Sequence, residues 1–173
     1  YLTGTIVLKK NVTVKLEEGS KIIGSRNISD YPDKGRRKAL IFAEKSDNIS
    51  IIGRGEIDGN GAAFNQGNDA PNRPTLVLLL DCNKVKVNGV KLSNSGFWTF
   101  RFVRCDGVDI SKVYVEGHAN WNNDGFDIES KNVTIRDCVL DTDDDAICFK
   151  SEDPNYVVEN ITVTNCNLSS NCN

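Results

Sequence analysis

The chain has 173 residues, 39% of them hydrophobic, and its 21 basic and 24 acidic residues leave a formal net charge of −3. This length and composition are enough for one domain with a core. The balance of charges excludes the concentrated basic surface that phosphate binding needs, and no apolar run approaches the ~20 residues of a membrane span. We therefore expect neither a nucleic-acid nor a membrane partner.

One short pattern recurs along the chain: a polar residue or glycine, an aliphatic residue, a polar residue and a second aliphatic residue. Its copies begin at Asn48, Lys84, Gly107, Asn132 and Asn160, and a weaker copy begins at Asn11. The leading aliphatic residues fall at positions 12, 49, 85, 108, 133 and 161, at intervals of 37, 36, 23, 25 and 28 residues. Such periods are typical of a solenoid. The first two intervals could each hold one coil with an inserted loop, or one and a half coils.

The alternation of apolar and polar residues within each copy predicts half-buried strands rather than helices. No segment between the copies has the pattern of a crossover helix, so we expect parallel strands wound into coils. The predicted fold is all-β, a right-handed single-stranded parallel β-helix, with its hand taken from the preference of parallel connections. Two columns of aliphatic side chains should form its core: Ile49, Val85, Val108, Val133 and Ile161, and then Ile51, Val87, Ile110, Ile135 and Val163.

We expect residues 1–173 to form a single β-helix domain that continues beyond both ends, because Tyr1 opens within a strand-like pattern. One basic cluster, Lys34 to Lys38, falls in an inserted loop. It is interpreted either as a solvated loop or as a contact for an anionic polymer.

Asparagine and cysteine recur at fixed places in the repeat. Six Asn-x-Ser/Thr sequons occur, at Asn11, Asn27, Asn48, Asn132, Asn160 and Asn167. Because asparagine tolerates left-handed backbone, we interpret those that open a repeat as a column at a coil corner rather than as glycosylation sites. Cys82 and Cys105 occupy equivalent places, as do Cys138 and Cys166. Equivalent residues stack about 4.8 Å apart with parallel side chains that suit a disulfide poorly, so we predict reduced, stacked thiols.

Two acidic motifs carry the functional argument: Asn122-Asn123-Asp124-Gly125-Phe126-Asp127 and Asp143-Asp144-Asp145-Ala146. They lie about one repeat apart. Hydrolysis of a glycosidic bond needs an acid for the leaving oxygen and a base for the water, with roughly 6.5–9.5 Å between the carboxyls when configuration is inverted. Neighbouring coils can supply that separation, and repulsion should raise the pKa of at least one carboxyl. Alternatively, these residues cap turns or bind Ca²⁺, Asp141 and Asp143 being the first candidates for a structural role.

On these motifs the chain resembles glycoside hydrolase family 28, the polygalacturonase and rhamnogalacturonase group of pectin-degrading β-helix enzymes. Asn122-Asn123-Asp124 is similar to the family's Asn-Thr-Asp, and the segment from Asp143 to Ser151 is similar to its Gly-Asp-Asp-Ala/Cys motif and following strand. Likeness extends to residues 1–25, 30–32, 53–59, 73–74 and 97–99. The resemblance implies that Asp144 is the general acid and that Asp124 and Asp145 hold and deprotonate the water.

The resemblance also implies a polysaccharide or oligosaccharide substrate, no cofactor or metal, an extracellular or periplasmic location and a monomeric full-length protein. Four further residues are candidates for substrate binding. Trp121 could stack on a sugar ring, whereas Trp98 is assigned to the core. His118, the only histidine, lies either on the cleft side or in a turn, Lys150 could pair with a substrate carboxylate or with the aspartates, and Asn122 could bind substrate or shape its turn.

The chain departs from the family in two places. Cys172 stands where the family has the histidine of Gly-His-Gly, which supports the catalytic aspartates, and the family's later Arg-x-Lys motif would lie beyond Asn173. These departures predict a divergent member with a partial cleft in this chain. A Ca²⁺-dependent polysaccharide lyase and a noncatalytic polysaccharide-binding β-helix remain as alternatives.

Overall fold

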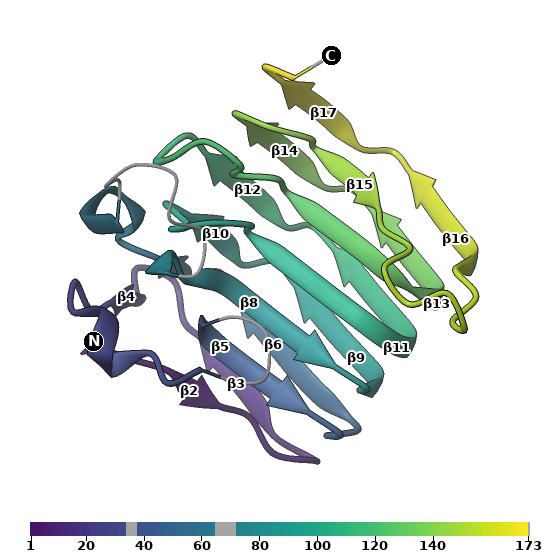
Figure 1. Cartoon of the computed structure of the whole chain (residues 1–173), viewed down its shortest axis with the longest axis horizontal. Coiled ribbons are helices and arrows are strands. Elements are labelled where there is room, and N and C mark those ends of the chain that lie inside the picture. The colour runs from purple at the N-terminus through teal and green to yellow at the C-terminus, as the bar shows by residue number, and fades with distance from the viewer. Residues whose placement is uncertain (34–37, 65–71, 173) are drawn as a thin grey trace.

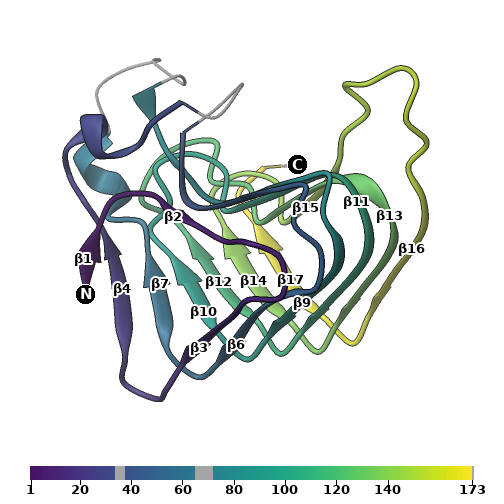
Figure 2. The same cartoon turned by 90° about the horizontal axis from the view of Figure 1, so that it is seen from below.

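The computed structural model describes residues 1–33, 38–64 and 72–172, which wind into a stack of coils (Figures 1 and 2). Each coil contributes one strand to each of three faces, and neighbouring strands on a face are parallel. Two of the faces are continuous through long bent strands. The architecture is the right-handed parallel β-helix that the sequence predicts.

The strands are assigned to the faces as follows. The first face contains β2 (Ile6–Val7), β5 (Ala39–Glu44), β8 (Thr75–Leu80), the first halves of β11 (Phe100–Ser111) and β13 (Phe126–Arg136), and β15 (Ile147–Phe149). The second face contains β3 (Thr13–Leu16), β6 (Ile49–Gly53), β9 (Asn83–Asn88), the second halves of β11 and β13, and β16 (Glu159–Thr164). The third face contains β1 (Leu2–Thr3), β4 (Lys21–Gly24), β7 (Glu56–Asp58), β10 (Lys91–Ser93), β12 (Tyr114–Gly117), β14 (Val139–Thr142) and β17 (Asn167–Ser170).

The connections from the third face back to the first face carry the inserted segments. Two short 3-10 helices lie in these connections, η1 (Ile28–Asp30) between β4 and β5 and η2 (Gly61–Phe64) between β7 and β8. Because β3 pairs directly with β6 and β6 with β9, each long interval is one coil with an inserted loop. Residues 34–37 of the basic cluster lie outside the described residues. None of the described helices is long or apolar enough to cross a membrane.

The predicted repeats form the second face. Both predicted aliphatic columns are in direct Cα register from β6 through β9, β11 and β13 to β16. Their members are buried except in β16, where Ile161 is half-buried and Val163 is 39% exposed. Burial of an aliphatic side chain of this size contributes about 1.5–3 kcal/mol. These columns are therefore a main source of the stability of the stack.

The corner before the second face is built as predicted. Asn11, Asn48, Asn132 and Asn160 all have left-handed backbone, with φ between 55° and 63°. The Asn48 amide donates to Asn11 Oδ1 over 3.0 Å, and the Asn160 amide donates to Asn132 Oδ1 over 3.1 Å. A ladder of side-chain amides thus joins the first two coils and the last two coils at this corner, while Lys84 and Gly107 occupy the same place in the coils between.

The cysteine prediction is also confirmed. All six cysteines are free thiols. Cys82, Cys105 and Cys138 are buried, and Cys166 is half-buried beside the end coil. The thiols fill space between coils, so a disulfide is not needed to hold the stack together.

The left-handed backbone of the ladder asparagines predicts how substitutions there change the free energy of unfolding. Substitution of Asn132 by alanine should lower the free energy of unfolding by about 1–2 kcal/mol, because an ordinary residue is strained in left-handed backbone. Asn132→Gly should cost less, since glycine removes the ladder hydrogen bonds but not the backbone compatibility. Urea unfolding followed by circular dichroism compares the two variants, and an equal or larger loss for glycine would contradict this account.

Candidate active site

The two acidic motifs meet at the start of the first face. Asp124 lies two residues before the start of β13, and Asp144 and Asp145 lie in the bend between β14 and β15. Backbone hydrogen bonds join these turns, from the Gly125 N–H to the Asp145 carbonyl over 2.8 Å and from the Phe126 N–H to the Ala146 carbonyl over 3.0 Å. The carboxylates predicted to lie one coil apart are therefore on neighbouring coils and at the same end of the face.

The turn before Asp124 is held by Asn123, which is completely buried. Its amide nitrogen donates to the carbonyls of Ser95 and Phe97 over 3.0 and 2.6 Å, and its Oδ1 accepts the Asn120 N–H over 2.7 Å. A buried polar group with several satisfied hydrogen bonds specifies one local conformation. Asn123 thus fixes the position of the turn from which Asp124 projects.

Both carboxylate oxygens of Asp144 accept hydrogen bonds. Oδ2 accepts the side-chain amide of Asn122 over 3.1 Å, and Oδ1 accepts the backbone N–H of Asp145 over 3.0 Å. The side chain of Asp144 is half-buried. These two donors, one from each coil, set the direction of the carboxyl group while leaving it accessible.

Asp124 belongs to a buried charge cluster with Asp127 and Lys150. Lys150 Nζ lies 3.4 Å from Asp124 Oδ2 and 3.1 Å from Asp127 Oδ1. Burial raises the pKa of Asp124; the Lys150 ammonium opposes this shift, and the Asp144 carboxylate adds to it. Burial and the Asp124 carboxylate raise the pKa of Asp127 to about 8. At neutral pH the cluster therefore holds a proton on Asp127 in addition to the lysine charge.

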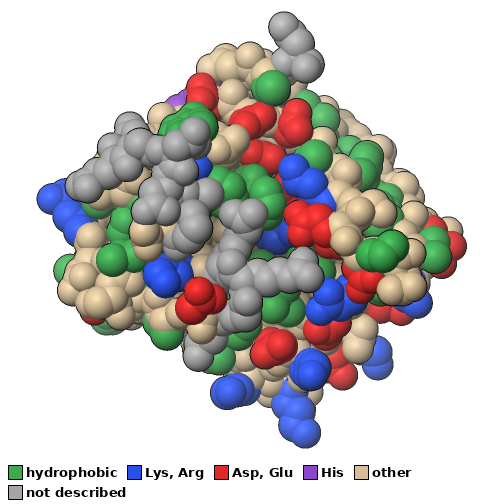
Figure 3. Space-filling view, viewed as in Figure 1, with side chains coloured by type: hydrophobic (Ala, Val, Ile, Leu, Met, Phe, Trp, Pro, Cys, Tyr) green, Lys and Arg blue, Asp and Glu red, His purple; other side chains and the backbone are tan. Residues whose placement is uncertain are grey.

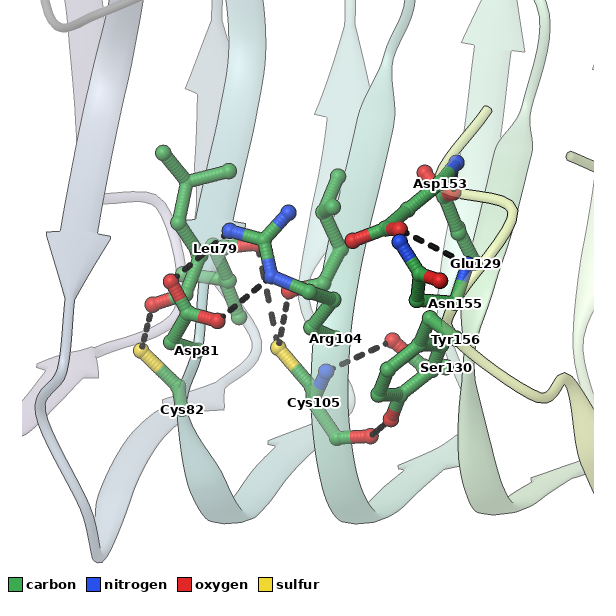
Figure 4. A network of polar contacts seen from close by, with 12 residues as sticks. Leu79, Asp81, Cys82, Arg104, Cys105, Glu129, Ser130, Asp153, Asn155 and Tyr156 are labelled. Carbon is green, nitrogen blue, oxygen red and sulfur yellow. Dashed lines mark hydrogen bonds and ion pairs between the residues drawn. The ribbon is translucent and has the colours of Figure 1, made fainter. Parts of the chain in front are cut away.

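The segment that follows Lys150 is anchored to the neighbouring strands. Glu129 Oε1 accepts the backbone N–H groups of Glu152 and Asp153 over 2.8 and 2.7 Å, and its other oxygen accepts Arg101 Nη2 over 2.7 Å. Figure 4 shows Asp153, Asn155 and Tyr156 of this segment beside the bend of β11, where the Tyr156 hydroxyl donates to the Cys105 carbonyl over 3.0 Å. The segment after β15 is thus tied to β11 and β13.

The structure places the other predicted residues as follows. His118 Nε2 lies 3.2 Å from Asp141 Oδ1, and the Asn171 amide donates to Asp143 over 3.2 Å. These contacts fit the turn alternative for His118 and the structural roles of Asp141 and Asp143. Trp121 is 39% exposed beside the acidic motifs. Figure 3 shows acidic, basic and hydrophobic side chains gathered on the face of the molecule that it presents.

The assignment of Trp98 to the core is confirmed for its burial, whereas the neighbours of its ring are charged groups. Trp98 is buried, but its ring lies 5.0 Å from Lys150 Nζ and 5.3 Å from the guanidinium carbon of Arg101. An aromatic ring attracts cations to its face. Trp98 therefore packs with the charged groups outside the coil rather than with the columns inside it.

Four buried charged residues of this region were missed from the sequence: Arg73, Arg101, Asp127 and Glu129. A signal existed for three of them, because Phe100-Arg101-Phe102 and Phe126-Asp127-Ile128-Glu129 alternate and the phenylalanines must face the core. Strand alternation then directs Arg101, Asp127 and Glu129 outward. Arg73 offers no such signal, since it lies in a connection.

Two groups bring three possible metal-ligand atoms within 4.8 Å of one another: Asp124, Asp127 and Cys148, and then Asp144, Asp145 and Cys172. In the first group the Lys150 ammonium already supplies the positive charge. The second group is less buried, and a closed zinc site would need a fourth ligand. The second group also places Cys172 beside the aspartates, where the resemblance positions the family's histidine.

Comparisons with known proteins agree with this geometry. The model of the family described as "Glycosyl hydrolases family 28" matches residues 2–170. Polygalacturonase QRT2 of Arabidopsis thaliana is 31% identical over 145 residues, which are 79% of this chain and 32% of that protein. Polygalacturonase-2 of Solanum lycopersicum is 28% identical over 163 residues, which are 89% of this chain and 35% of that protein. The chain spans about a third of the length of these curated relatives.

Solved structures show the same fold. A polygalacturonase from Erwinia carotovora superimposes with a TM-score of 0.82 and 25% identity, over 96% of this chain and 52% of that chain. A family 28 exopolygalacturonase from Yersinia enterocolitica gives a TM-score of 0.87 at 24% identity, over 96% of this chain and 41% of that chain. The likeness to the second structure concerns the fold alone.

The buried charge cluster predicts a pH dependence of stability. The pKa of Asp127 is about 8 in the folded chain and ~3.9 in an unfolded one, so stability that is fully present below pH ~4 is lost as the pH rises through 8. The side chain of Asp127→Asn cannot ionise, so its free energy of unfolding should not show this loss. We therefore expect the difference between Asp127→Asn and the wild type to shift by at least about 1.4 kcal/mol in favour of the variant from pH 4 to pH 9.

Chemical unfolding at both pH values measures this difference, with Asp109→Asn on the second face as the matched control. If the wild type and Asp127→Asn keep the same difference at both pH values, Asp127 does not hold a proton in the folded chain.

Proposed function

The chain belongs to family 28 of the glycosyl hydrolases, and we propose that its protein hydrolyses O-glycosidic bonds of a pectin-type polysaccharide, a galacturonan or a rhamnogalacturonan. The observation that carries the proposal is the meeting of Asp124, Asp144 and Asp145 on adjacent coils at one end of the first face. The names of the relatives support the substrate class, since they include polygalacturonases and rhamnogalacturonases. A pectin-type substrate in turn supports an extracellular or periplasmic location.

We assign the general acid to Asp144. Its carboxyl group is half-buried, and its direction is set by donors from Asn122 and from the Asp145 backbone. A protonated carboxyl group still has lone pairs for both donors, so the same hydrogen bonds can hold it before and after it gives its proton to the leaving oxygen. Preorganised direction of this kind is what general acid catalysis requires.

We assign the holding and deprotonation of the attacking water to Asp124 and Asp145, with inversion of configuration. Asp124 is held by Lys150, and the effect of burial on its pKa makes its ionised form a stronger base than an exposed aspartate. Asp145 comes from the neighbouring coil and is half-buried. In inverting enzymes the separation between the acid and the base leaves room for such a water.

Substrate binding is assigned first to Trp121. Its half-exposed ring lies beside the motif and offers a flat apolar surface for a sugar ring. The ion pairs of Lys150 support a role in holding Asp124 rather than a substrate carboxylate. The contact between His118 and Asp141 supports a role for the histidine in the coil corner.

The proposal predicts that the complete protein carrying this chain releases reducing sugar from pectic polymers in the presence of a chelator. Asp144→Asn and Asp124→Asn should each reduce the rate by about 10²–10⁴-fold, the usual contribution of a positioned acid or base. Asp141→Asn is the matched control, since its partner is His118, and should retain most of the activity. Reducing-end assays on polygalacturonic acid and rhamnogalacturonan measure these rates, and proton NMR identifies the first anomer formed.

Three outcomes would reject parts of the proposal. An unsaturated product whose formation stops with the chelator would identify a lyase. Binding without product release, unchanged in Asp144→Asn, would identify a noncatalytic module. A first product with retained configuration would reject the assignment of Asp124 and Asp145 to an inverted water attack.

A further inference from the structure

Arg73 is a buried arginine that reaches the acidic motifs from two coils away. It lies in the connection that enters β8, whereas Asn122 lies in the turn that enters β13. Its side chain is only 2% exposed. A buried guanidinium is costly unless its surroundings stabilise it, so its contacts indicate what the fold retains it for.

The guanidinium donates to both halves of one turn. Nη1 donates to the carbonyl of Trp121 over 2.7 Å, and Nη2 donates to Oδ1 of Asn122 over 3.0 Å. The guanidinium carbon also lies 4.6 Å from the centre of the Phe97 ring and 4.7 Å from that of Trp121. The planar group therefore packs against two aromatic rings while it binds the turn.

These contacts decide which way the Asn122 amide points. Because Oδ1 accepts the hydrogen bond from Arg73, Nδ2 is directed to the opposite side, where it donates to Asp144 Oδ2 over 3.1 Å. The reversed amide would present an oxygen to the carboxylate and a nitrogen to the guanidinium, and both contacts would be repulsive. A continuous chain of donors thus runs from Arg73 through Asn122 to Asp144.

We propose that Arg73 is a positioning residue for the Asp144 carboxyl group, acting through the amide of Asn122. The proposal rests on the proposed hydrolase function, in which Asp144 supplies the proton. Arg73 does not touch the reacting atoms. Its effect is to keep one orientation of a hydrogen-bond donor that sets the direction of the acid.

Arg73→Lys tests the proposal, because lysine keeps the charge but lacks the planar fork that serves two acceptors and stacks on aromatic rings. We expect kcat on the preferred pectic substrate to fall at least about tenfold with a much smaller change in KM, as for a misdirected catalytic group. Arg104→Lys is the matched control, since Arg104 also makes two hydrogen bonds, to Asp81 at a coil corner. It should leave kcat unchanged.

A double-mutant cycle separates positioning from general loss of stability. If Arg73 acts through Asn122, Arg73→Lys should add little to the loss of kcat already caused by Asn122→Ala. The isosteric Asn122→Asp retains an acceptor for Arg73 but loses the donor to Asp144, and should lose kcat without unfolding. Independent, additive effects of Arg73→Lys and Asn122→Ala, or an unchanged kcat with a lowered melting temperature, would overturn the proposal.

A readout without substrate keeps the test separate from the hydrolase function. The side-chain amide protons of Asn122 can be followed by ¹⁵N NMR in the wild type and in Arg73→Lys. We expect slow exchange and one orientation in the wild type, and faster exchange in the variant. If the amide is equally protected in both proteins, Arg73 does not orient it, whether or not the protein hydrolyses sugar.

Discussion

Parallel stacking of coils in register is the constraint on which the rest of the structure depends. Neighbouring strands must lie about 4.8 Å apart to make their hydrogen bonds, so any residue type that recurs at one place in the repeat becomes a column. Aliphatic residues at such a place form the core, and asparagines at another form a ladder at a left-handed corner. One geometric rule therefore accounts for both the stability of the interior and the shape of the corners.

The same stacking rule also places like charges close together at the candidate site. Stacking brings the carboxylates of consecutive coils close together, where they repel one another and lose hydration. Lys150 compensates the deepest pair, Asp124 and Asp127, with one ammonium group. The remaining excess charge is reduced by the raised pKa of Asp127. A carboxylate-rich site is thus compatible with a stable stack, because one lysine and one bound proton reduce the repulsion between its carboxylates.

Side chains that do not belong to the repeated pattern hold the candidate site in place by hydrogen bonds. Asn123 ties its turn to the preceding coil, Glu129 ties down the segment after β15, and Arg73 reaches Asn122 across 49 residues of sequence. All three side chains are buried. The aliphatic columns set where the strands lie, while these buried polar side chains set the directions of the functional groups.

Much of the fold was predictable from the sequence because the repeat is local. The alternation of residues within five or six positions determines a strand, and its recurrence determines a column, so the aliphatic columns, the asparagine corners and the unbridged thiols could all be predicted. The place of the two aspartate motifs followed from the same register. The burial of Trp98 was predictable too, but strand patterning cannot tell a ring inside the coil from one packed against Lys150.

The sequence by itself therefore determined the repeat, its parallel winding and the meeting of Asp124 with Asp144 and Asp145. Only the tertiary structure decided the partners of Lys150, the pairing of His118 with Asp141 and the contacts of Arg73. The physical reason is that these side chains lie in turns and connections of irregular length, where no period fixes their direction. Their positions depend on side chains of other coils, which become neighbours only after the chain has wound.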